Sequence, residues 1–223
     1  MKKSRSYFLL LVLFLLTGCY QSKKVSYTDV ILKKEIQVKH TMPIIVLDPG
    51  HGNFDLGTHN EFCEEKALAL NTALYVKTEL VKKGYRVVMT RARDDYVPLK
   101  KRAQIANDTK SQVLVSVHYN AAHNTAAHGI EVFYPKTAKQ WKLKRSKMLA
   151  QSILRKMLSN TGAFSRGVKA GNFCVIRETN MPAVLVECGF ITNAEECKKM
   201  IDPAYQKVLA RSIAEGLDEY FQM

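Results

Sequence analysis

Residues 45–58 read IVLDPGHGNFDLGT, an apolar segment that runs directly into a loop of glycines, carboxylates and one histidine. The apolar part has the composition of a β-strand, and the loop places His51 directly after it. In open parallel sheets, ligands bind beyond the carboxyl ends of the strands. The stretch therefore indicates either a tight turn or a functional loop, and the rest of the chain has to distinguish the two.

Further along the chain, apolar strand-like segments alternate with helical ones. Strands are expected at PIIVLD (43–48), YRVVMTR (85–91), SQVLVSVH (111–118), GIEVFYP (129–135), NFCVIRE (172–178) and PAVLVECGF (182–190). Helices are expected at 65–83, 99–107 and 138–158, and a last helix after Asp202 as its N-cap, whereas SRGVKAG (165–171) is expected to be a loop. This alternation predicts an α/β fold: a three-layer single domain with a mainly parallel, twisted central sheet of about six strands, flanked by helices.

The chain is strongly basic. Its formal net charge is +14 over 223 residues, which favours an acidic partner such as nucleic acid, anionic lipid or a carboxylate-bearing polymer. The lysines are scattered, and the sequence contains no nucleic-acid-binding motif. Export, indicated by the N-terminus, also disfavours nucleic acid.

The N-terminus has the organisation of a signal peptide. A basic start is followed by an apolar run over residues 7–16, shorter than the roughly 20 residues that span a bilayer. The ending LTGC resembles the lipobox of bacterial lipoproteins, which implies lipidation of Cys19; a plain signal peptide is the alternative. We therefore expect a signal peptide at 1–18, the lipidated cysteine and a tether at 19–41, and one folded domain at 42–223.

These segments predict an exported protein that is lipid-anchored in the cell envelope. Tyr20 follows the cysteine, in place of the aspartate that retains some lipoproteins in an inner membrane. Attachment to the outer membrane is thus favoured if the cell has one.

The four other cysteines are Cys63, Cys174, Cys188 and Cys197. They form no CxxC pair, so a cysteine-based zinc site is not expected. Export permits disulfides, but four cysteines allow three connectivities, and the sequence leaves the choice open. Cys174 and Cys188 lie in apolar, strand-like segments and are interpreted as buried small side chains.

Three predicted strands end in residues suited to metal chemistry: His51, His118 and Glu187. A glutamate within a buried strand is costly unless it is paired, hydrogen-bonded or bound to a metal. Two histidines, one carboxylate and an open position are a common arrangement for hydrolytic zinc. Glu64 and Glu65, which open the first helix, are candidates for the third ligand.

Several separate motifs carry a family resemblance. DPGHG, EEKALAL, SVHYNA, GIEVF and MPAVLVECGFITN occur in this order from about residue 44 to the C-terminus. Together they resemble the zinc-dependent N-acetylmuramoyl-L-alanine amidases of bacterial cell-wall turnover. The resemblance implies that the substrate is the peptidoglycan amide between N-acetylmuramic acid and L-alanine.

The resemblance also implies roles for individual residues. His51, Glu65 and His118 would hold one Zn²⁺ per chain, and Glu187 would be the catalytic base. Glu64 leaves a one-residue ambiguity, but Leu70, five residues after Glu65, fits the register of the family and favours Glu65.

Two residues are candidate substrate contacts. Arg177 suits a stem-peptide carboxylate, with a structural ion pair as the alternative, and Asn120 would contact substrate or orient the metal loop. Arg102 and Asn107 are interpreted as structural. The protein is expected to act as a monomer.

Two other functions stay open at this stage. One is a zinc peptidase or carboxypeptidase acting on stem peptides, and the other is a catalytically inactive wall-binding lipoprotein. Division-associated members of the family insert a helix that plugs the zinc site between the second histidine and the catalytic glutamate. Here the predicted elements account for residues 118–187, so we expect no autoinhibitory helix.

Overall fold

The computed structural model describes residue 26 and residues 42–223. The chain divides into two units, Met1–Val38 and Lys39–Met223. The predicted signal peptide, Cys19 and almost all of the predicted tether therefore lie outside the described residues. None of the helices in the described part combines the length and apolar character that a bilayer span needs.

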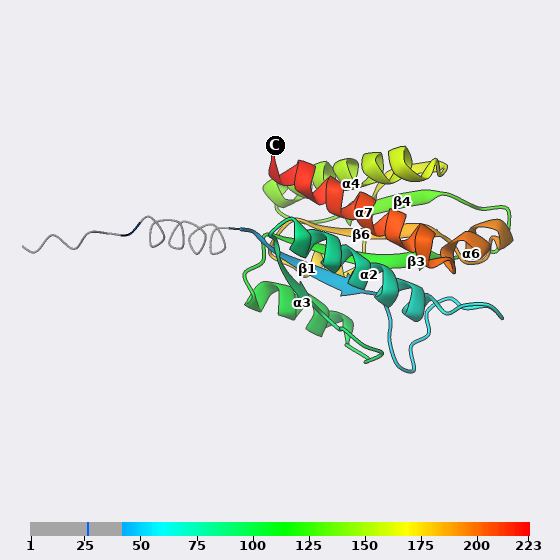
Figure 1. Ribbon diagram of the computed structural model, residues 1–223. Coiled ribbons are helices and arrows are strands. Elements are labelled where there is room, and N and C mark those ends of the chain that lie inside the picture. The colour runs from blue at the N-terminus through cyan, green and yellow to red at the C-terminus, as the bar shows by residue number, and fades with distance from the viewer. Residues whose placement is uncertain (1–25, 27–41) are drawn as a thin grey trace, which may run out of the picture. The chain divides into compact units, whose positions relative to one another are not determined.

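The described domain is built on one six-stranded sheet (Figure 1). Its strand order is β2-β1-β3-β6-β4-β5, and every neighbouring pair is parallel except β4 with β6. The elements are β1 (Ile44–Pro49), α2 (Glu65–Lys82), β2 (Arg86–Met89), α3 (Leu99–Asp108), β3 (Val113–Asn120), β4 (Ile130–Pro135), α4 (Gln140–Thr161), β5 (Ser165–Gly171), α5 (Cys174–Arg177), β6 (Ala183–Phe190), α6 (Ala194–Met200) and α7 (Pro203–Phe221). The predicted three-layer α/β fold with a mainly parallel sheet is confirmed.

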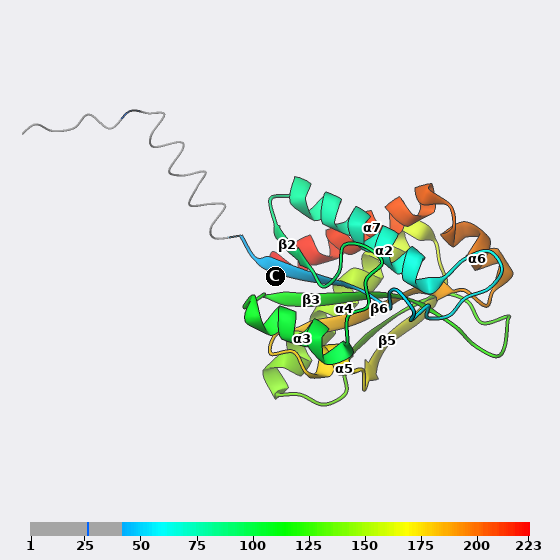
Figure 2. The ribbon, with the colours of Figure 1, turned by 90° about the horizontal axis from the view of Figure 1, so that it is seen from below.

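Helices cover both faces of the sheet. On β1, Ile45 and Leu47 pack into a large apolar core with α2, α4 and α7, whereas Val46 packs into a smaller core with α3 and α5. This alternation follows from the two-residue period of a strand and makes β1 apolar on both faces. Figures 1 and 2 show the two helical layers in views that differ by a 90° turn about the horizontal axis.

One predicted strand is wrong, and so is one predicted loop. Residues 174–177 of NFCVIRE form the short helix α5, which buries Val175 and Ile176 against the sheet. A short apolar run does not distinguish a strand from a buried helical turn. The strand β5 comes instead from SRGVKAG, the predicted loop. It is an edge strand paired only with β4, and its polar composition is typical of a sheet edge.

The last helix begins as predicted. The Asp202 side chain accepts a hydrogen bond from Ala204 N at 2.8 Å, with Pro203 in the first turn. The preceding helix α6 was not predicted; Asn193 caps it by accepting from Glu196 N at 3.0 Å. α6 lies beside the loop between β1 and α2, where Asn60 Nδ2 donates to Cys197 Sγ at 3.3 Å.

Candidate metal centre

Three polar side chains lie side by side across the middle of the sheet. His118 on β3 pairs in register with Glu187 on β6, and Glu187 pairs with Glu131 on β4. By strand alternation they share the face that carries α3 and α5, since Leu185, two residues before Glu187, belongs to the smaller core. β3 continues two residues beyond His118, where the predicted strand SQVLVSVH ended, and β6 runs to Phe190, the last residue of the predicted strand PAVLVECGF.

His51, Glu65 and His118 form a compact cluster at the carboxyl end of β1 and β3. One potential ligand atom from each lies within 4.8 Å of the others. Glu65 Oε1 is 3.1 Å from His51 Nε2 and 2.8 Å from His118 Nδ1. No other group of three or more histidine, cysteine or carboxylate side chains in the described residues has this arrangement.

The backbone of the β1–α2 loop brings His51 to this cluster. His51 itself has φ 59°, in the left-handed region that non-glycine residues rarely adopt. Two glycines make room for the cluster: a Cβ on Gly50 would lie 2.3 Å from the His118 ring, and one on Gly57 would lie 2.5 Å from Glu65 Oε2. Gly50 and Gly57 of IVLDPGHGNFDLGT are thus explained by close approach to the candidate ligands.

Glu65, and not Glu64, points into the cluster. Glu65 opens α2 and is buried, with its Oε2 accepting from Thr58 N at 2.9 Å. Burial raises the pKa of the Glu65 carboxyl, but hydrogen bonds with His118 and His51 outweigh this effect and hold the pKa well below its usual range. Glu64 is more exposed, and its carboxylate lies 3.5 Å from Lys66 Nζ.

Asp55 orients the His51 ring. Its Oδ1 lies 2.8 Å from His51 Nδ1, which leaves Nε2 facing Glu65. A carboxylate on the second ring nitrogen is the usual support for a metal-binding histidine, because it selects the tautomer and the ring orientation. Two imidazoles and one carboxylate are also a donor set that zinc accepts. The cluster therefore fits a single zinc ion.

Two buried arginines hold the carbonyl groups of the loop. Arg102 on α3 donates to the carbonyls of Pro49 and His51 and to the carboxylate of Asp48. Arg91 donates to the carbonyls of Pro49 and Gly50 at 3.1 and 2.6 Å. Arg102 was predicted to be structural, whereas Arg91 was not singled out. Its only signal in the sequence is an arginine at the end of the predicted strand YRVVMTR (85–91).

Glu187 is buried beside the cluster without a hydrogen-bond partner for its Oε2 among the described residues. Burial raises the pKa of this carboxyl well above its usual range, and the nearby carboxylates of Glu65 and Glu131 raise it further. A carboxyl with a raised pKa and a free oxygen at a candidate metal centre is well suited to proton transfer.

The sequence pattern of the family described as N-acetylmuramoyl-L-alanine amidase matches residues 45–219, a range that includes every residue of this cluster. The chain belongs to the N-acetylmuramoyl-L-alanine amidase family. Among solved structures, it is similar to an amidase of this name from Clostridium difficile 630, with TM-score 0.77 and 40% identity over 81% of this chain and 97% of that chain. It is also similar to the catalytic domain of the amidase CwlV from Bacillus (Paenibacillus) polymyxa var. colistinus, with TM-score 0.75, 37% identity, and coverage of 81% and 99%.

Two curated relatives that carry an amidase name are longer than this chain. The amidase LytC of Bacillus subtilis is 35% identical over 178 residues, which make up 80% of this chain and 35% of LytC. The probable cell wall amidase LytH of Staphylococcus saprophyticus is 34% identical over 181 residues, covering 79% of this chain and 58% of LytH. The chain thus spans about a third to three fifths of the length of these two relatives.

A polar network in this amidase domain surrounds Glu131, a residue that was not predicted to belong to the site. Asn120 Nδ2 donates to Glu131 Oε1 at 2.6 Å, and Lys169 Nζ and Arg166 Nε donate to Oε2. Glu131 is buried, so these donors compensate for its desolvation. The structure places Asn120 in this network; a contact with substrate stays a prediction.

Arg177 does not lie where the sequence suggested. It belongs to α5, not to a strand end, and donates to Glu178 Oε1 at 2.8 Å and Asn172 Oδ1 at 2.7 Å. Its role toward substrate also stays a prediction. Beside the cluster, a cavity of about 240 Å³ is lined by His51 and His118 from the metal centre and by Tyr96 and Val97 from the loop before α3.

Proposed function

We propose that this protein is a zinc-dependent amidase that cleaves the bond between N-acetylmuramic acid and L-alanine in peptidoglycan. The observation that carries the proposal is the cluster of His51, Glu65 and His118 beside a buried carboxylate oxygen of Glu187 that has no hydrogen-bond partner within residues 42–223. Membership of the amidase family and a cavity next to the two histidines support it.

His51, Glu65 and His118 would hold the zinc ion. When bound, zinc polarises an amide carbonyl and lowers the pKa of a bound water toward ~7. The carboxylate of Glu187 would accept the proton of the attacking water and then deliver a proton to the departing amine of L-alanine. Its free Oε2 and raised pKa suit both steps, because the group must take up the proton and release it within one turnover.

Digestion of defined muropeptides tests the proposal. The full chain, loaded with zinc, should release intact stem peptides that begin with a free L-alanine amine, detected by mass spectrometry. Cleavage within or at the end of the stem peptide would instead support the zinc peptidase, which the same donor set allows. Binding to sacculi without cleavage of any bond would support the inactive wall-binding protein.

We also propose that the site is open without an activator. Between His118 and Glu187, the described elements are β4, α4, β5 and α5. Helix α4 packs into the large core with α7, on the opposite face of the sheet from the smaller core that contains α5. The purified, zinc-loaded protein should therefore digest sacculi alone; activity that appears only after a second protein is added would overturn this proposal.

The envelope location is a further part of the proposal. We propose an exported protein anchored by a lipid on Cys19, at the membrane that faces the peptidoglycan. Cys19→Ala should abolish incorporation of labelled lipid and release the protein into the soluble envelope fraction. Retention in the membrane fraction would exclude the anchor. The predicted monomer is testable by light scattering of the released form.

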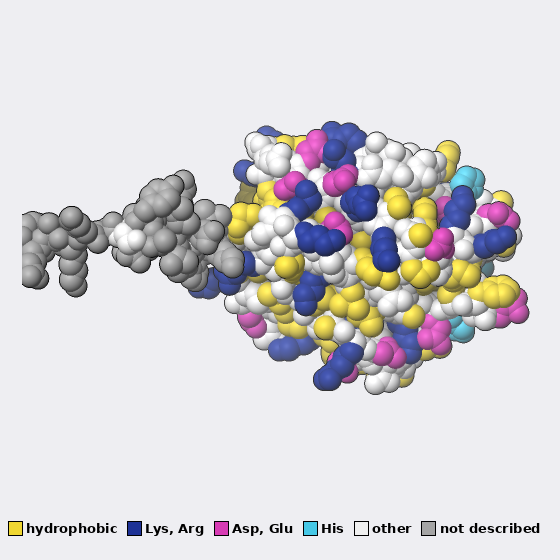
Figure 3. Space-filling view, in the orientation of Figure 1, with side chains coloured by type: hydrophobic (Ala, Val, Ile, Leu, Met, Phe, Trp, Pro, Cys, Tyr) yellow, Lys and Arg dark blue, Asp and Glu magenta, His cyan; other side chains and the backbone are white. Residues whose placement is uncertain are grey.

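Basic residues agree with an anionic polymer as substrate. In the face shown in Figure 3, lysine and arginine side chains are spread among acidic and apolar ones and do not form a single block. Such a surface attracts a polyanion over long range without defining one high-affinity site. The basic surface therefore supports an anionic polymer as the substrate. The proposed site of cleavage rests instead on the candidate metal centre and on membership of the family.

A further inference from the structure

Two cysteines distant in sequence meet beside the metal loop. Cys63 Sγ lies 3.3 Å from Cys197 Sγ, although 134 positions separate them. Cys63 belongs to the loop between β1 and α2, two residues before Glu65, and Cys197 lies on α6. In the described residues, all four cysteines are free thiols, and no other pair of cysteine sulfurs has a recorded contact.

Asn60 holds the two sulfur-bearing segments together. Its side-chain amide donates to Ile191 O at 3.2 Å and to Cys197 Sγ at 3.3 Å. Its side-chain oxygen accepts from the backbone N of Cys63 at 3.0 Å. The loop and α6 are therefore already docked through a third side chain, and the sulfur contact does not depend on the two thiols alone.

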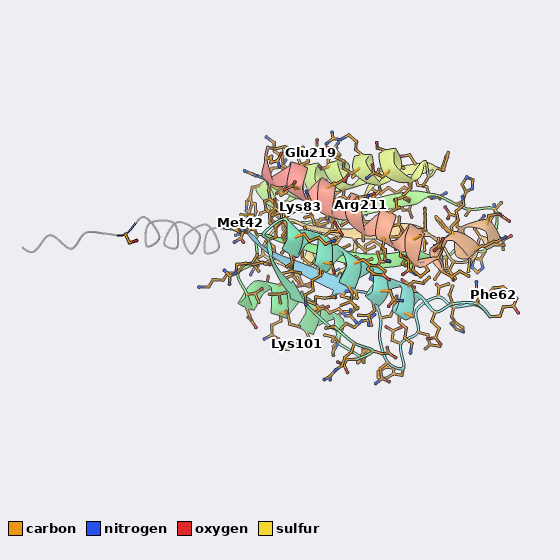
Figure 4. The ribbon with its side chains drawn as sticks, in the orientation of Figure 1. Met42, Phe62, Lys83, Lys101, Arg211 and Glu219 are labelled. Atoms are coloured by element: carbon orange, nitrogen blue, oxygen red, sulfur yellow. The ribbon has the colours of Figure 1, made fainter. Side chains whose placement is uncertain are left out.

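The two thiols differ in exposure. Cys63 is partly exposed, whereas Cys197 is 3% exposed. Phe62, next to Cys63, lies at the outer end of the loop and is 69% exposed (Figure 4). An oxidant from solution can thus reach Cys63 first, and Cys197 stands behind it.

We propose that Cys63 and Cys197 form a disulfide bond that ties the metal loop to α6. The oxidant is a disulfide, either a small molecule or a thiol–disulfide oxidoreductase of the envelope. Cys63 attacks one sulfur of the oxidant, forms a mixed disulfide and releases one thiol. Cys197 then attacks Cys63 Sγ and displaces the second thiol. Both protein sulfurs are oxidised, the oxidant is reduced to two thiols, and these take up the two protons.

The geometry requires little movement. A disulfide has a sulfur–sulfur distance of about 2.05 Å, so the two sulfurs must approach by about 1.3 Å. Cys63 lies in the loop between β1 and α2, outside the helices and strands, so the backbone there is not held by a helical or sheet ladder. Disulfides persist in oxidising compartments outside the cytoplasm, which agrees with the proposed envelope location.

The bond would restrain the loop that carries the candidate ligands. Between His51 and Glu65, this loop is held at its start by Arg91 and Arg102 and at its end by α2. A bond at Cys63 adds a covalent restraint two residues before Glu65. This consequence, unlike the bond itself, rests on the proposed metal site: the oxidised protein should lose zinc to a chelator more slowly than the reduced protein.

Mass spectrometry tests the bond directly. The reduced full chain, purified in detergent, is incubated with oxidised glutathione. Its mass should fall by two hydrogens, and a non-reducing peptide map should join the peptide of Cys63 to that of Cys197. Cys63→Ser and Cys197→Ser should each lack this link, whereas the control Cys174→Ser should keep it. A lasting glutathione adduct on Cys63, a link between other cysteines, or no change in mass would overturn the proposal.

Thermal unfolding provides a second measurement. Because the bond closes a long segment of chain, oxidation should raise Tm by roughly 5–10 °C, and dithiothreitol should reverse the shift. The shift should be absent in Cys63→Ser and present in Cys174→Ser. An equal shift in Cys63→Ser would assign the stabilisation to another oxidation and overturn the proposal. Neither measurement requires amidase activity or metal, so a failed disulfide and a failed amidase function are distinguishable.

Discussion

Glu187 on β6 is the register partner of His118 on β3, so a carboxylate with one oxygen unpaired in the described part of the chain lies one strand away from a candidate metal ligand. Neighbouring strands lie roughly 4.8 Å apart, and residues in register on parallel strands present their side chains to the same face. The spacing between the candidate metal ligand and the candidate proton carrier is therefore a property of the sheet and not of a loop. Rigid placement of this kind is what proton transfer at a metal-bound reactant requires.

Glu187→Gln should separate metal binding from turnover. Glutamine keeps the shape of the side chain but cannot accept the proton, so we expect zinc content to be retained and kcat to fall by roughly 10²–10⁴-fold. Elemental analysis of the purified variant and an assay on muropeptides check both parts. Loss of zinc from this variant would reassign Glu187 as a ligand.

Glu65→Ala and Glu64→Ala form a matched pair for the third ligand. Glu65 is buried against both histidines, whereas Glu64 is directed at Lys66. We expect Glu65→Ala to reduce zinc to a small fraction of one equivalent and Glu64→Ala to bind it normally. Zinc titration against a chromophoric chelator measures the difference. The opposite result would show that the ligand is Glu64.

Arg102→Lys should weaken metal binding without touching a ligand. Lysine keeps the positive charge but lacks the planar guanidinium group that donates hydrogen bonds to Asp48, Pro49 and His51 at the same time. We expect zinc affinity to fall by roughly 10–100-fold, as for other groups that orient metal ligands.

The control for this variant is the neighbouring Lys101→Arg. Lys101 is exposed on α3 and points away from the domain (Figure 4), so the reverse exchange there should leave zinc affinity unchanged. Circular dichroism should give the same helix content for both variants. Unaltered affinity in Arg102→Lys would mean that Arg91 alone positions the loop.

The acid side of the pH profile should respond to Glu131 and Lys169 in opposite directions. Glu187 must be ionised to accept a proton, so kcat/KM should fall as pH drops through its pKa. The Glu131 charge raises that pKa, so Glu131→Gln should move the acid limb to lower pH. Lys169→Met removes a cation that pairs with Glu131, so it should move the limb to higher pH.

Profiles of kcat/KM from pH 4 to 9 in both variants measure these shifts, with zinc content as the control. Because the two variants break the same ion pair, a purely structural effect would move both profiles the same way. Shifts of the same sign would therefore argue against the electrostatic role of Glu131 and favour a role in packing.

Much of the site follows from local sequence patterns. His51, His118 and Glu187 were identified because each closes an apolar run, and apolar runs indicate buried strands whatever their partners are. The family motifs then separated Glu65 from Glu64, in agreement with the side of α2 that Glu65 occupies in the structure. These inferences need only the period of a strand or helix and the order of the motifs.

Other features depended on which segments pack together. The structures predicted for NFCVIRE and SRGVKAG are an example. The polar segment SRGVKAG forms strand β5 because β4 has an edge with which it can pair. The apolar NFCVIRE became α5 because the face beneath it could bury one helical turn. Local composition carries no information about a free edge elsewhere in the chain, so the sequence suggested the reverse assignment.

By itself, the sequence determined an α/β domain and predicted His51, His118 and Glu187 as candidate site residues, because burial and periodicity are local properties. Only the tertiary structure decided that Glu131 lies beside Glu187, that Arg91 and Arg102 hold the His51 loop, and that Cys63 meets Cys197. Each of these contacts joins segments far apart in the chain. Strand register and helix packing set such distances, and both are decided when the whole core is formed.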